Sequence, residues 1–105
     1  MFLYSITCGN GKDKEGKPID NVSGRLGIVR AHLAKVFGGF SEYAVTGGYR
    51  MASGEYVEEP AVRWDIVADD AAALEIRKWA GMIRDLFHQE SVLSTKKVLE
   101  NAEFI

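Results

Sequence analysis

The fold of this protein is decided by residues 40–68, FSEYAVTGGYRMASGEYVEEPAVRWDIVA. Apolar and polar side chains alternate on both sides of Ser53-Gly54, a pair that is typical of a hairpin turn. The apolar side chains share one parity within each half: Tyr43, Val45, Tyr49 and Met51 before the turn, and Val62, Trp64 and Ile66 after it. We therefore predict two antiparallel strands, with a bulge at Gly47-Gly48 and an irregular start near Pro60.

Segments with a helical period flank this hairpin on both sides. Residues 21–37 begin at a capping residue, Asp20 or Asn21, and stop at Gly38-Gly39; their apolar stripe contains Val22, Leu26, Val29, Leu33 and Val36. Asp69-Asp70 cap a second stripe, which contains Ala73, Ile76, Ala80, Ile83 and Phe87. We predict two amphipathic helices that pack their stripes on the sheet.

Strand-like segments lie near both ends of the chain. Residues 2–8 place Phe2, Tyr4, Ile6 and Cys8 on one parity, and residues 91–99 contain Val92, Leu93, Val98 and Leu99. The resulting order, β-α-β-β-α-β, is typical of an α+β ferredoxin-like fold. We predict a four-stranded antiparallel sheet in the order 4-1-3-2, with both helices on one face. This fold carries many unrelated functions, so it does not name one.

The composition indicates a single domain over residues 1–105. Apolar residues make up 47% of the chain, enough for a core without disulfides or metal. The net charge of −2 argues against nucleic acid as a partner, since phosphate binding needs clustered Lys and Arg. The single cysteine, Cys8, excludes an internal disulfide, and no apolar run is long enough to span a membrane. We expect a cytoplasmic protein with no membrane partner.

Two segments fall outside the repeating patterns. Residues 9–20 combine glycines, a proline and charges, which predicts a mobile charged loop. Part of this loop matches the start of a phosphate-binding P-loop, but Pro18 stands where a Ser or Thr should hold magnesium, so we interpret it as a solvated loop. Residues 100–105 end in Phe104 and Ile105, and we expect this tail to dock on the protein.

Candidate binding residues lie on the sheet face opposite the helices. If the helices cover Tyr4, Ile6, Val45, Val62, Trp64 and Ile66, the other face presents Ser5, Thr7, Glu42, Ala44, Thr46, Arg50, Arg63 and Asp65. We predict a ligand-binding set of Arg50, Arg63, Asp65, Glu42 and Thr7. The two arginines would converge on one anionic group. The alternative is that this polar face binds no ligand and is either exposed to water or buried between two copies of the protein. No catalytic, cofactor-binding or metal-binding set is evident.

Two short motifs resemble a family of short bacterial proteins of unknown function. They are Glu59-Pro60-Ala61 at the start of a strand and Gln89-Glu90-Ser91-Val92-Leu93 at the start of another, and the similarity covers about residues 39–93. The resemblance supports the fold and implies no chemistry.

We favour a small non-enzymatic binding module that forms homo-oligomers. Its partner would be a small anionic ligand, for example a nucleotide, or another protein; phage inhibitors and sequestering proteins are of this size. The alternative is a small dimeric α/β-barrel enzyme. There, Asp65 or Glu42 would act as base while Arg50 or Arg63 holds an anionic substrate.

Overall fold

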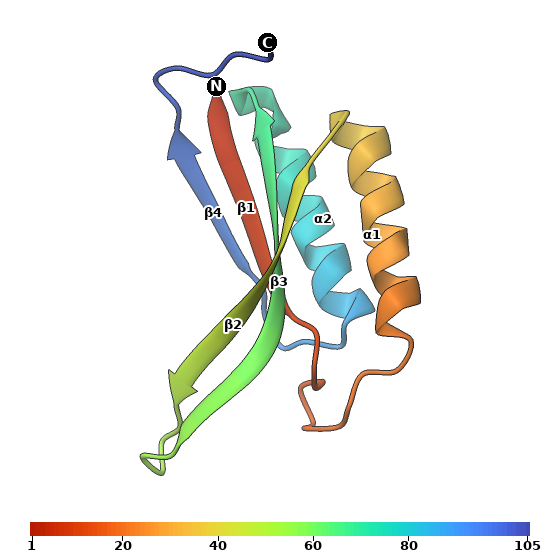
Figure 1. Ribbon diagram of the computed structural model, residues 1–105, viewed down its shortest axis with the longest axis vertical. Coiled ribbons are helices and arrows are strands. Elements are labelled where there is room, and N and C mark those ends of the chain that lie inside the picture. Colours follow the sequence, from red (N-terminus) through yellow and green to blue (C-terminus); the bar gives the residue numbers. More distant parts are fainter.

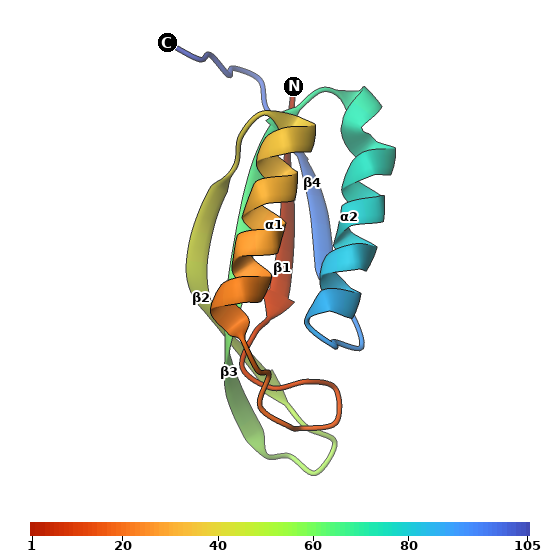
Figure 2. The same ribbon diagram turned by 90° about the vertical axis from the view of Figure 1, so that its right-hand side faces the viewer.

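The computed structural model describes residues 1–105 and contains the predicted elements in the predicted order (Figure 1). Their bounds are β1 Phe2–Gly9, α1 Val22–Phe37, β2 Ser41–Arg50, β3 Tyr56–Ala68, a short 3-10 turn Asp70–Ala72, α2 Ala73–Leu86 and β4 Leu93–Val98. The strands form one antiparallel sheet in the order β2-β3-β1-β4, and both helices cover the same face (Figure 2). The ferredoxin-like fold is therefore confirmed. No helix has the length and hydropathy needed to cross a membrane.

The core lies between the helices and the two central strands. β1 and β3 each pair with a neighbour on both sides, so their alternating side chains divide between a helix-covered face and an open face. The buried cluster contains Tyr4, Ile6, Cys8, Val62, Trp64 and Ile66 from these strands, and Val29, Leu33, Ile76, Ala80, Ile83 and Phe87 from the helical side. The predicted parity of β1 and β3 is confirmed.

The predicted parity of β2 is wrong. Its register pairs Glu42 with Trp64 and Val45 with Ala61, which places Glu42 on the helix side and Val45 on the open side. β2 is an edge strand, and a charged side chain is tolerated there when it finds partners. Arg30 of α1 supplies one partner and the Trp64 indole supplies another. The apolar alternation of β2 therefore follows the open face instead.

The far half of the β2–β3 hairpin extends beyond the lower ends of the helices (Figure 1). Its pairing runs without a break from Ser41–Asp65 to Arg50–Tyr56, so the predicted bulge at Gly47-Gly48 and irregularity at Pro60 are absent. Gly48 has a different role. A Cβ at this position would lie 2.5 Å from the Tyr56 hydroxyl, so the glycine leaves room for the Tyr56 side chain across the ribbon.

The two irregular segments have definite positions. In the loop of residues 10–20, the Asp13 carboxylate accepts hydrogen bonds at 2.9 Å from the backbone N–H groups of both Glu15 and Lys17. These hydrogen bonds form a turn within the loop. Other hydrogen bonds, from Gln89 to Lys12 and from Arg25 to Asp20, join the loop to the helices. At the other end, the Leu99 N–H donates to the Met1 carbonyl. Beyond it, Phe104 borders a hollow of about 380 Å³ yet remains 84% exposed.

Candidate functional site

Three of the five predicted site residues meet on the open face of the sheet. Thr7 lies opposite Arg63, and Ser5 lies opposite Asp65. The Arg63 Nε atom is 3.2 Å from the Asp65 carboxylate, which also accepts a 2.7 Å hydrogen bond from the Ser5 hydroxyl. The Arg63 guanidinium lies 4.5 Å from the centre of the Tyr43 ring. The Arg63 charge is thus already balanced by Asp65 and covered on one side by an aromatic ring.

The predicted convergence of the two arginines is wrong. Arg50 pairs with Tyr56 at the end of β2, whereas Arg63 pairs with Tyr43, seven residues earlier on the same strand. That spacing corresponds to about 23 Å along a strand. An odd number of residues also places Arg50 on the opposite face of the ribbon. The error follows directly from the wrong parity of β2. In place of two convergent arginines, the open face has the ion pair of Arg63 and Asp65.

Glu42 occupies a structural position. Its carboxylate accepts hydrogen bonds from Arg30 Nη2 at 2.7 Å, from Arg30 Nε at 3.0 Å and from Trp64 Nε1 at 2.8 Å. The hydrogen bonds from Arg30 are the main cause that lowers the pKa of Glu42, and the indole N–H adds to the effect. A carboxylate held in this way joins α1 to the sheet edge and is a weak proton acceptor.

A different place offers a cavity with chemically useful side chains. The β1–α1 loop and the β2–β3 hairpin, both at the lower end of the molecule in Figure 2, together line a cleft of about 430 Å³. We call it the loop–hairpin cleft. Its lining comes from Gly11, Lys12, Asp13, Lys14, Gly16 and Pro18 of the loop, and from Tyr49, Met51, Val57, Glu58, Glu59 and Pro60 of the hairpin. A cavity of this size suits a small molecule.

Beside the cleft, the fold brings together residues that are far apart in the sequence. A Cβ at Gly9 would lie 3.3 Å from Glu59 Oε1 and 3.0 Å from Gln89 Oε1, so both side chains reach over this glycine. The absence of a side chain at Gly9 therefore makes their approach possible. Glu59 and Gln89 belong to the two motifs quoted above for the family resemblance. Sequence reasoning missed their proximity, although the acidic pair Glu58-Glu59 before Pro60 was a usable signal.

The carboxylates that line the cleft outnumber the lysines by one. The cleft is lined by three carboxylates and two lysines, and Tyr49 and Met51 add half-exposed aromatic and thioether surface. The side-chain oxygen of Asn10 is buried beside the cleft without a protein partner, while the Asn10 N–H donates to the Pro60 carbonyl at 3.1 Å. Carboxylates together with an aromatic ring favour a ligand that carries a positive charge.

The reactivity of the Cys8 thiol tests whether this residue is buried in the core next to Glu59. Burial, assisted by the charge of Glu59, raises the pKa of Cys8 to about 12. A raised pKa keeps the sulfur as an unreactive thiol, since only the thiolate is a nucleophile. We expect iodoacetamide at about pH 8 to leave Cys8 unmodified in the folded protein and to alkylate it after denaturation in urea. Mass spectrometry reads both states, and rapid labelling without urea would contradict the burial.

Comparison with known proteins places this fold beside two kinds of solved structure. A phage SAM lyase in complex with S-methyl-5'-thioadenosine matches over 91% of this chain and 79% of its own, with 23% identity and a TM-score of 0.64. The same kind of enzyme without ligand matches at 19% identity over 97% and 92% of the two chains, with a TM-score of 0.65. CutA1 from Pyrococcus horikoshii matches at 12% identity over 98% of this chain and 87% of its own, with a TM-score of 0.66. At these identities the similarity shows the ferredoxin-like fold. No family model and no curated protein matches this sequence.

Proposed function

We propose that this protein binds S-adenosylmethionine in the loop–hairpin cleft and cleaves it to release S-methyl-5'-thioadenosine. The observation that carries the proposal is the cleft itself, which combines carboxylates with an aromatic and a thioether side chain. A solved protein of the same fold holds the nucleoside that this cleavage would release. This replaces the small anionic ligand expected from the sequence, because the arginines on which that expectation rested lie apart.

The chemistry of the ligand fits the chemistry of the cleft. S-adenosylmethionine carries a sulfonium cation, which is attracted by the carboxylates of Glu58 and Glu59 and by the face of an aromatic ring such as Tyr49. The adenine ring has flat apolar surface suited to Tyr49 and Met51. We assign Glu59 the main role toward the cation, because it is the more buried of the two glutamates and approaches Gln89 over Gly9.

Cleavage at this site needs no metal, water or external base. The ligand's own carboxylate can displace the thioether by closing a five-membered lactone, so that a C–O bond forms as the C–S bond breaks. The electron pair of the broken bond goes to sulfur, which becomes neutral. The protein then acts by holding the reacting groups in the geometry for ring closure. Asp65 and Glu42, the base candidates of the sequence analysis, are engaged elsewhere.

We also propose that the protein works as a homo-oligomer. The hairpin beyond the helices is a two-stranded ribbon, and such ribbons are marginally stable without further packing. The open face and its β4 edge expose large apolar side chains, among them Tyr43 and Leu93. We propose that a second copy of the protein covers these side chains in the oligomer.

The proposal is tested by calorimetry, chromatography and native mass spectrometry on the purified protein. We expect S-adenosylmethionine to bind and S-methyl-5'-thioadenosine to accumulate with time. The native mass should be at least twice the mass of one chain. Binding without product would support a sequestering protein instead of an enzyme. Binding of ATP in preference to both adenosyl compounds would overturn the cationic-ligand proposal.

A further inference from the structure

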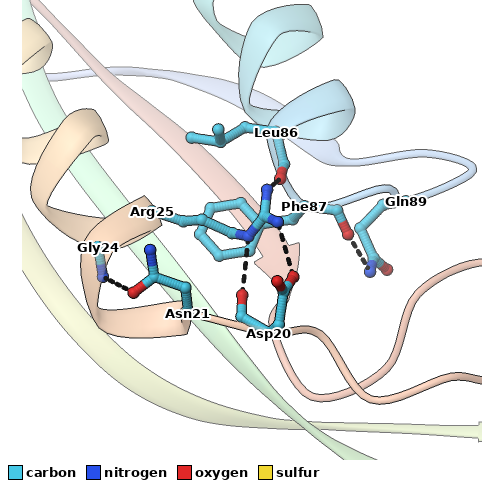
Figure 3. A network of polar contacts seen from close by, with 7 residues as sticks. All are labelled: Asp20, Asn21, Gly24, Arg25, Leu86, Phe87 and Gln89. Carbon is cyan, nitrogen blue, oxygen red and sulfur yellow. Dashed lines mark hydrogen bonds and ion pairs between the residues drawn. The ribbon is translucent and has the colours of Figure 1, made fainter.

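An arginine joins the β1–α1 loop to the end of the second helix. Arg25 of α1 donates from Nε to the Asp20 carbonyl at 2.9 Å, from Nη2 to the Asp20 carboxylate at 2.8 Å, and from Nη1 to the Leu86 carbonyl at 2.6 Å (Figure 3). Its side chain is only 19% exposed. The hydrogen bond and charge of Arg25 lower the pKa of Asp20, which favours the ionised carboxylate. The last carbonyls of a helix favour a cation, which suits Arg25 at Leu86.

Residues of the turn after α2 hold the middle of the loop through two hydrogen bonds, and a third hydrogen bond lies within the turn. Gln89 Nε2 donates to the Lys12 carbonyl at 2.7 Å and to the Phe87 carbonyl at 3.0 Å. The backbone N–H of Lys14 donates to the His88 carbonyl at 2.8 Å. The loop is therefore attached near both its middle and its end to one short stretch, residues 86–89. The other hydrogen bonds of the Asp13 turn lie within the loop itself.

We infer that Arg25 and Gln89 are positioning residues that hold this loop in place as one wall of the loop–hairpin cleft. Of the two loop residues that they hold, Lys12 lines the cleft, and Asp20 lies two residues beyond Pro18, the last loop residue of the lining. Neither side chain lines the cleft itself. Loss of either attachment therefore frees the wall without removing a ligand contact. The inference about the wall stands on these contacts alone, whereas its effect on S-adenosylmethionine rests on the function proposed above.

The first experiment measures loop opening without any ligand. Lysyl endopeptidase cuts after Lys12 and Lys14 only when the loop leaves its position, and mass spectrometry identifies these cuts. We expect Arg25→Ala to speed cleavage there roughly tenfold or more, as expected for the loss of hydrogen bonds from a charged group. Arg25→Lys, which can keep the Asp20 ion pair, should restore part of the protection. Arg30→Ala is the matched control, because Arg30 also joins α1 to a carboxylate but contacts no loop residue.

Gln89→Leu tests the same wall if Arg25→Ala does not fold. It removes the hydrogen bond to Lys12 and leaves the Arg25 contacts in place. We expect faster cleavage after Lys12 and Lys14 at an unchanged midpoint of thermal unfolding. Cleavage at the wild-type rate in both variants, or equal acceleration in Arg30→Ala, would overturn the inference.

The second experiment measures turnover of S-adenosylmethionine. For Arg25→Ala we expect KM to rise by roughly tenfold while kcat changes little, since a loosened wall weakens binding before chemistry. A fall in kcat at constant KM would contradict a positioning role. If the loop opens in Arg25→Ala but the wild-type protein neither binds nor cleaves S-adenosylmethionine, the wall is confirmed and the proposed function fails.

Discussion

Replacing Trp64 with alanine is expected to lower the free energy of unfolding by about 3–5 kcal/mol. The Trp64 side chain is 0% exposed in the middle of β3, and its ring centre lies 6.4 Å from that of Phe87. Removing it leaves a large cavity and also deprives Glu42 of the indole N–H. A domain of this size has a total stability of roughly 5–15 kcal/mol, so little margin would remain. Urea unfolding followed by circular dichroism measures the change.

Two variants separate the volume of the indole from its hydrogen bond. Trp64→Phe keeps an aromatic ring and loses the N–H, and Glu42 retains Arg30, so the loss should be well below that of Trp64→Ala. Trp79→Ala removes the other tryptophan, which is partly exposed and stacks on His32, and should also cost less. A Trp64→Ala protein with a near wild-type unfolding midpoint would show that β3 does not face the helices.

The second large effect is expected at the cleft. Glu59→Gln should weaken binding of S-adenosylmethionine by roughly 30-fold or more, the scale for loss of one partner of a partly desolvated charge pair. S-methyl-5'-thioadenosine has no sulfonium charge, so its affinity should change little. The ratio of the two Kd values, measured by calorimetry, therefore isolates the contribution of the charge. Glu103→Gln, in the tail and outside the cleft lining, is the matched control.

An equal loss of affinity for both ligands would contradict this prediction. It would mean that Glu59 shapes the cleft through its approach to Gly9 and does not act through its charge. The thiol of Cys8 gives an independent check that the substitution has removed a local negative charge. Because the charge of Glu59 contributes to the raised pKa of Cys8, this pKa should fall in Glu59→Gln. Loss of packing around Cys8 would also lower its pKa, so the fall reports loss of charge only when the midpoint of thermal unfolding is unchanged.

Local sequence patterns were reliable where a residue has neighbours on every side. Ile6 and Trp64 lie on central strands beneath the helices, so alternation alone predicted the face that each occupies. The pattern failed on β2, an edge strand, where Glu42 lies on the helix side because Arg30 reaches it from α1. The Arg50 and Arg63 site failed with it. Only Thr7, Arg63 and Asp65 of that predicted set remain together.

The sequence by itself determined the order of the elements, the strand pairing of the ferredoxin-like fold and the buried faces of β1 and β3. These depend on residue periods, which are local and repeat along the chain. Only the tertiary structure decided the cleft. Glu59 and Gln89 meet over Gly9 because the register of β1 and β3 places Gly9 opposite Ala61 and α2 ends beside the same strand end. No local period encodes that register or the position of the loop, since both follow from how separate elements pack.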